Sequence, residues 1–387
     1  MFKQKSFRRQ AIVCFAVFLT ASLTAAQADP VLTAEKGSDI PTEVEVANLL
    51  KKQPKSYDAH YAAGRLYEAR GFYNEAQEEY KKAVSFPGNR PDGYKRLAQL
   101  ALRSSEYPKA EKAATDGLQR FPKDYGMLLT AGFVLHNQNK LAPALNMYQR
   151  ARAAKPNDAQ ICLAIADVLA AMHKPEQALL EIQRFEKLSK PNVLSIYEKA
   201  KVLLALKRVD EALTEMDKNF ASDPANFANN KLYATTLAAR GKKAKALEVS
   251  LCLLANGVGK EMESAKIRST NLLTQLPSDA APIIAAAENR LRDNKIKARL
   301  HFALGDVYDR KEMRELAIKQ YQDGLKLNEK FARGHLRLGQ DLERHRKDLK
   351  GALTAYQRAS ALDGDKKDRE IANSLKDLQK KLAAKTK

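Results

Sequence analysis

The sequence predicts an all-α protein, a right-handed α-solenoid of helix-turn-helix repeats with a capping helix at each end. One pattern of small and large apolar residues returns at a fixed interval along most of the chain, which is typical of a solenoid. Within each copy, apolar residues lie three and four apart, as they do on the buried face of an amphipathic helix. The composition is 44% hydrophobic with few glycines and prolines, which suits a helical core.

Six copies begin at residues 57, 91, 125, 159, 193 and 227 without a change of frame. The eighth and twentieth residues of each copy are small, as at Gly64 and Ala76, so that two helix backbones can approach closely. Gly71, at the fifteenth position, suits a tight turn between the helices. Proline at the thirty-second position, as at Pro122, lacks an amide hydrogen and therefore ends the second helix.

This pattern resembles the tetratricopeptide repeat family in period and in its order of small and aromatic residues. One family feature is missing, because none of the copies has the tryptophan that often occupies the fourth position. The resemblance implies that the first helix of each repeat lines a concave groove that binds other proteins.

Residues 1–28 are interpreted as a secretory signal peptide, with a basic start and then an apolar run that ends in small residues at Ala26-Gln27-Ala28. An uncleaved anchor helix remains the alternative. Either interpretation predicts an exported protein, periplasmic if the source is a Gram-negative bacterium and otherwise secreted. After cleavage of the signal, no membrane span is expected.

The remaining chain divides by its repeat pattern. It predicts a linker and N-terminal capping helix at 29–56, six tandem repeats at 57–260, a degenerate helical hairpin at 261–297, two further repeats at 298–364, and a basic C-terminal capping helix at 365–387. The hairpin breaks the pattern because Arg268 and Asn271 stand where apolar residues belong. The last repeat has one residue inserted between its helices.

Catalysis is not predicted, because the sequence lacks the common nucleophile, phosphate-loop and zinc-protease motifs. No catalytic residue, metal ligand or cofactor is therefore assigned. His335 and His345 lie ten residues apart without a third ligand nearby in the sequence. Cys162 and Cys252 lie in different repeats and are expected to be buried thiols rather than a disulfide.

The groove implied by the resemblance gives the candidate site residues. They are Leu129, Phe133, His136, Leu163, Asp167, Tyr197, Lys201, Leu204 and Lys231. Exposed apolar residues on a concave wall favour binding of an extended or helical segment of a protein partner. A helix rotation of one residue would instead turn some of these side chains into the core. The function expected is a non-enzymatic protein-binding scaffold or assembly factor outside the cytoplasm.

The net charge of +21 leaves a second hypothesis open. A basic surface could bind a polyanion, such as acidic polysaccharide, anionic lipid or nucleic acid. Nucleic acid is disfavoured, because the basic residues are not interleaved with stacking aromatic residues. Salt separates the two hypotheses, because binding of a polyanion weakens steeply as salt rises and binding to an apolar groove does not.

Overall fold

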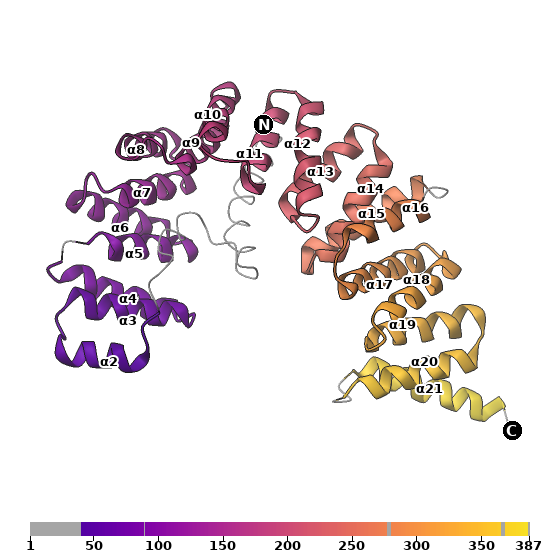
Figure 1. Cartoon of the computed structure of the whole chain (residues 1–387). Coiled ribbons are helices and arrows are strands. Elements are labelled where there is room, and N and C mark those ends of the chain that lie inside the picture. Colours follow the sequence, from indigo (N-terminus) through magenta and orange to yellow (C-terminus); the bar gives the residue numbers. More distant parts are fainter. Residues whose placement is uncertain (1–39, 89, 277–279, 365–367, 386–387) are drawn as a thin grey trace, which may run out of the picture. The chain divides into compact units, whose positions relative to one another are not determined.

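The computed structural model describes residues 40–88, 90–276, 280–364 and 368–385 (Figure 1). These residues form helices and connecting turns with no strand, and consecutive helices pair as antiparallel hairpins. The prediction of an all-α repeat solenoid is confirmed. The predicted signal peptide lies outside the described residues.

The helices fall into two compact units that meet in sequence at Leu206 and Lys207. Unit 1 contains α2 (Glu43–Lys52), α3 (Tyr57–Ala69), α4 (Tyr73–Ser85), α5 (Asp92–Arg103), α6 (Tyr107–Arg120), α7 (Tyr125–Asn137), α8 (Leu141–Ala154), α9 (Ala159–Ala171), α10 (Pro175–Leu188) and α11 (Val193–Ala205). Each helix of unit 1 packs mainly against the one before it and the one after it, as expected for stacked repeats.

Unit 2 begins with the partner helix of α11 in the repeat pattern. It contains α12 (Val209–Ser222), α13 (Phe227–Ala239), α14 (Lys243–Asn256), α15 (Gly259–Gln275), α16 (Ala280–Arg290), α17 (Asn294–Arg310), α18 (Arg314–Leu327), α19 (Ala332–Asp341), η2 (Leu342–Arg346), α20 (Leu349–Leu362) and α21 (Arg369–Lys385).

The turn inside each repeat places one residue in the left-handed region of backbone conformation. Glycine occupies this position at Gly71 and Gly241, with φ of 82° and 72°. Elsewhere a residue with a side chain is held there, as at Asn139 and His173. The amide of the next residue donates to a carbonyl of the preceding helix, as from Lys174 to Leu169, so the turn caps the helix whichever residue occupies it.

A glycine in the first helix of several repeats faces a tyrosine ring in the second. A Cβ atom at Gly64 would lie 2.6 Å from Cε1 of Tyr80, and one at Gly132 would lie 2.6 Å from Cε1 of Tyr148. Glycine is required here by close approach rather than by backbone conformation. The ring is the large residue of the repeat pattern, and the missing side chain makes room for it.

The two ends of the chain carry helices that cover the terminal repeats. Helix α2 begins at a capping box between Thr42 and Glu45, and its Val46 packs with Ala63 and Leu66 of α3. At the other end, Ile371 and Leu378 of α21 are buried in one cluster with Tyr356 of α20 and its neighbours.

Two irregular segments lie in unit 2. Helix α14 is buried from Ala246 to Ala255, and it packs against α13, α15, α16 and α17. The predicted degenerate hairpin therefore lies against a central helix of this unit. The residue inserted in the last repeat is accommodated at the end of its first helix, where Leu342–Arg346 form a single π-helical turn before Lys347 reverses the chain.

No helix among the described residues combines the length and the apolar composition needed to cross a membrane. Cys162 and Cys252 are free thiols, both buried. Burial raises the pKa of both thiols, that of Cys252 to about 12, which keeps them protonated and poorly reactive.

Candidate functional site

The first helices of consecutive repeats form one surface of unit 1, because α5 contacts α7 and α9 contacts α11. Helices α7, α9 and α11 each begin at a polar cap, at Asp124, Asp158 and Asn192, whose side chains accept hydrogen bonds from backbone amides of the first turn. These caps fix where each helix begins, and therefore which residues face the same side.

Eight of the nine predicted groove residues belong to these three helices. Leu129, Phe133 and Leu204 are half-buried, whereas Leu163 and Tyr197 are buried at 5% and 9% exposure. Phe133 packs partly against a cluster of alanines and Val134 between neighbouring repeats. We refer to Leu129, Phe133, His136, Asp167, Lys201 and Leu204 as the α7–α9–α11 face.

A chain of ionic contacts crosses this face from one repeat to the next. Asp167 of α9 lies between the neighbouring helices, with its carboxylate oxygens 3.9 Å from Nδ1 of His136 and 3.4 Å from Nζ of Lys201. Lys201 also donates to Oε2 of Glu198 at 2.7 Å, and its ammonium lies 5.5 Å from the centre of the Tyr197 ring. Four predicted residues are thus brought together, and Glu198 joins them.

Burial and neighbouring charges set the protonation of this cluster. Burial raises the pKa of Glu198. It would lower the pKa of Lys201, but Glu198 and Asp167 outweigh it and hold that pKa above its usual range. Burial lowers the pKa of His136, with Lys201 acting in the same direction and Asp167 opposing. At neutral pH the face therefore holds a fixed ammonium beside a neutral imidazole.

The ninth predicted residue, Lys231, belongs to α13 of unit 2. It is exposed, and its Nζ lies 5.9 Å from the ring centre of Phe227 in the preceding turn. Sequence reasoning missed Glu198, which is buried at 8% exposure although its charge predicts a surface position. Its place three residues before Lys201 is the spacing of a helical ion pair, which was the available signal.

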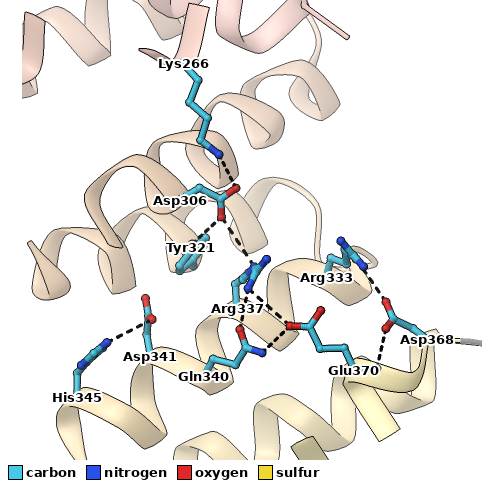
Figure 2. Close-up of polar contacts among 10 residues, drawn as sticks. All are labelled: Lys266, Asp306, Tyr321, Arg333, Arg337, Gln340, Asp341, His345, Asp368 and Glu370. Atoms are coloured by element: carbon cyan, nitrogen blue, oxygen red, sulfur yellow. Dashed lines mark hydrogen bonds and ion pairs between the residues drawn. The ribbon is translucent and has the colours of Figure 1, made fainter. Parts of the chain in front are cut away.

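Unit 2 has a polar network of its own, which extends over α15, α17, α18, α19 and α21 (Figure 2). The buried Lys266 lies 3.0 Å from Asp306, which also accepts a hydrogen bond from Tyr321 at 2.8 Å. Figure 2 shows Arg337 between Asp306 and Glu370, at 4.0 and 3.7 Å. The carboxylates of this network are neutralised by fixed cations, so it links helices rather than offering free charge.

A separate group lies beside this network, where α17 meets the π-helical turn. Nε2 of His345 is 3.8 Å from Oδ1 of Asp309 and 3.8 Å from Oδ1 of Asp341. Burial and the nearby Asp309 raise the pKa of Asp341 to about 7. Within the described residues, these three side chains are the group of histidine and carboxylate ligands close enough to hold a metal ion. In the sequence only the spacing of four residues between Asp341 and His345 hinted at it.

Two family models described as tetratricopeptide repeat match the chain, at residues 57–89 and 298–331 and at residues 95–159. A comparison with curated proteins found no match. Among solved structures, Pseudomonas aeruginosa pilF is 17% identical with a TM-score of 0.45, over 59% of this chain and 99% of that chain.

A tetratricopeptide repeat protein from Parabacteroides merdae is 13% identical with a TM-score of 0.47, over 74% of this chain and 98% of that chain. The structure of the APC/C hetero-tetramer Cut9-Hcn1 contains a chain that is 15% identical with a TM-score of 0.38. That match covers 87% of this chain, which spans 58% of the other chain's length. The family matches coincide with the paired helices and their small-to-large packing, and the chain is a tetratricopeptide repeat protein.

Proposed function

We propose that this tetratricopeptide repeat protein is a non-enzymatic scaffold or assembly factor that binds a segment of a protein partner along the α7–α9–α11 face, outside the cytoplasm. The repeat fold is consistent with protein–protein interaction, since the family generally provides binding surfaces rather than catalytic sites. The binding surface and the compartment are the specific parts of the proposal.

One observation carries the choice of surface. Half-buried apolar side chains, Leu129, Phe133 and Leu204, share the face with an ionic cluster whose members are already held by one another. A partner that covers this face gains apolar contact, and little side-chain freedom remains to be lost on binding.

Export is supported by the composition of residues 1–28 alone, a basic start followed by an apolar run and small residues. Mass spectrometry of the protein isolated from its native cells would test it. We expect a mature chain that begins at Asp29, recovered with the exported fraction. An intact Met1 in the cytoplasmic fraction would refute the localisation without affecting the binding surface.

The binding surface can be tested by photo-crosslinking in the native cells. A photoreactive phenylalanine analogue replaces Leu129 or Leu204, and as a control it replaces Leu180 of α10, which is 64% exposed on a second helix of the same unit. We expect one protein to crosslink at positions 129 and 204 and not at 180. Equal crosslinking at all three positions would exclude a specific surface.

Affinity for the identified partner then separates the two functional hypotheses. Leu129→Glu with Leu204→Glu should abolish binding, whereas Leu180→Glu with Leu188→Glu, an equal change of charge on α10, should leave it intact. Binding to the apolar face should change little between about 50 and 200 mM salt. A loss of orders of magnitude over that range, equal in both variants, would favour a polyanion bound to the basic surface.

A further inference from the structure

We propose that Asp309, Asp341 and His345 form a binding site for a divalent transition-metal ion, of which zinc is the test case, and that the ion fastens α17 to the π-helical turn. The site joins two consecutive repeats of unit 2 and is independent of the proposed binding face in unit 1.

The three side chains converge from three elements that the chain brings together. Asp309 is in the last turn of α17, Asp341 ends α19, and His345 lies in η2. Their ligand atoms all lie within 4.8 Å of one another. Ligands around a tetrahedral zinc ion are about 3.3 Å apart, given metal–ligand bonds of about 2.0–2.2 Å, so the observed 3.8 Å contacts need only a small contraction.

A second observation points to a ligand. The side chain of Asp341 is 4% exposed, and its Oδ2 atom has no hydrogen-bond partner within the described part of the chain. A buried carboxylate oxygen without a partner is costly, and each such group in a folded protein calls for an explanation. A bound cation would supply the missing interaction. The side chain of Asp309, in the same group of ligands, is 37% exposed, so an ion can reach the site from solvent.

The donor set selects the class of ion. One imidazole nitrogen with two carboxylates suits zinc and its neighbours, whereas calcium and magnesium favour oxygen ligands throughout. Three protein ligands leave a fourth position for water. The π-helical turn positions His345 for this role, since the extra residue shifts the end of the helix and brings that side chain to Asp309.

Arg314 disfavours metal binding at this site, and replacing it gives a sharper test of the proposal. Its guanidinium contacts Nδ1 of His345. A metal-bound histidine usually donates from its other ring nitrogen to an acceptor, which a guanidinium is not. Arg314 is exposed and would have to swing away. In the Arg314→Gln variant, the amide oxygen could accept that hydrogen bond, so this variant should bind zinc at least as tightly as the native chain.

The experiment titrates zinc chloride into the whole chain, purified without a histidine tag and stripped with a chelator, in a calorimeter. We expect one zinc ion per chain and a rise in the unfolding temperature with zinc. His345→Gln and Asp341→Asn should each weaken binding by at least about 100-fold, because loss of a ligand exceeds the 10- to 100-fold effect of losing a supporting group. X-ray absorption should show nitrogen and oxygen ligands only.

His335→Gln is the matched control, because His335 lies in the same repeat and contacts only the carbonyl of Glu329 among the contacts described for it. It should bind zinc as the native chain does. Circular dichroism checks that each variant is folded. The proposal is overturned if the native chain binds no zinc, in which case a proton shared by Asp309 and Asp341 explains the pair. Zinc binding that survives both His345→Gln and Asp341→Asn, or that weakens in Arg314→Gln, would overturn it equally.

Discussion

Two neighbouring repeats of unit 1, residues 125–158 and 159–192, fill the space between their helices in different ways. The first places Gly132 against the ring of Tyr148, and the second has Ala166 and Ile182 at the same two repeat positions. All four residues are buried. The comparison shows that the residue of the second helix is smaller where the first helix has alanine in place of glycine.

The same pairing occurs in three other repeats. A Cβ atom at Gly64, Gly305 or Gly339 would lie within 2.4–2.6 Å of a tyrosine ring in the second helix. Where the first helix has alanine, as at Ala98, the facing position is smaller, as at Ala114. Glycine in the first helix is therefore paired with tyrosine in the second helix, and alanine in the first helix is paired with a smaller residue.

The largest effect is expected when alanine in the first helix is combined with tyrosine in the second. In Gly132→Ala the added methyl group would overlap the Tyr148 ring, which is itself 3% exposed and has no free space to enter. Overpacking a core in this way costs about 2–3 kcal/mol, so the free energy of unfolding should fall by about that amount. Urea denaturation followed by circular dichroism measures it.

The control variant replaces both residues of the facing pair. Gly132→Ala with Tyr148→Ile reproduces the arrangement of Ala166 and Ile182, so the double variant should recover most of the stability that the single variant loses. A double variant no more stable than Gly132→Ala would contradict the idea that facing volumes are matched.

The two repeats also contribute different residues to the α7–α9–α11 face. There, ionic contacts rather than matched side-chain volumes connect these repeats to α11. Lys201→Met should lower the free energy of unfolding by about 1–2 kcal/mol, because it leaves the buried Glu198 without its cation. Replacing both, as Glu198→Gln with Lys201→Met, should cost less than Lys201→Met alone. Equal losses would show that the pair is not coupled.

A smaller difference lies in the turns. Asn139 and His173 occupy the same position of the two repeats with φ of 61° and 58°. Left-handed conformation costs about 1–2 kcal/mol for a residue with a side chain, and asparagine offsets more of this cost because its short polar side chain can hydrogen-bond locally. His173→Gly should therefore raise the free energy of unfolding by about 1 kcal/mol, and Asn139→Gly by only a few tenths. Thermal unfolding separates them, and a gain as large for Asn139→Gly would exclude side-chain strain as the cause.

Much of this organisation could be predicted from the sequence, because it depends on local spacing. The small and large positions and the glycine turns follow from residues a few positions apart, and the regular return of this pattern along the chain gives the period. The face could be predicted only in part: Leu163 and Tyr197 turn inward, since a small rotation of α9 or α11 decides between groove and core.

Contacts between repeats could not be predicted from the local spacing of residues. Asp309 meets His345 only because the chain folds α17 against the turn after α19. The inserted residue was visible in the sequence, but its effect on the helix end was not. Such contacts depend on how consecutive hairpins stack, which the repeat pattern indicates only in outline.

The smallest expected effect is the part of the pH dependence of stability that comes from His136 rather than from the other titrating groups of the chain. Burial lowers the pKa of His136 below its ordinary 6.5, while Asp167 opposes this and Lys201 adds to it. As pH falls below about 6.5, the unfolded chain binds a proton there that the folded chain does not. The contribution of His136 to stability is therefore present at higher pH and is lost as pH falls.

Urea unfolding midpoints at about pH 7.5 and 5.5, for the native chain and for His136→Gln, measure this contribution. Asp341 acts with the opposite sign, because its raised pKa of about 7 makes the folded chain take up a proton first. Both chains contain it, so only the difference between them reports His136. We expect the native chain to lose more stability than the variant on acidification, and parallel losses would mean that the imidazole is as well solvated in the fold as in the unfolded chain.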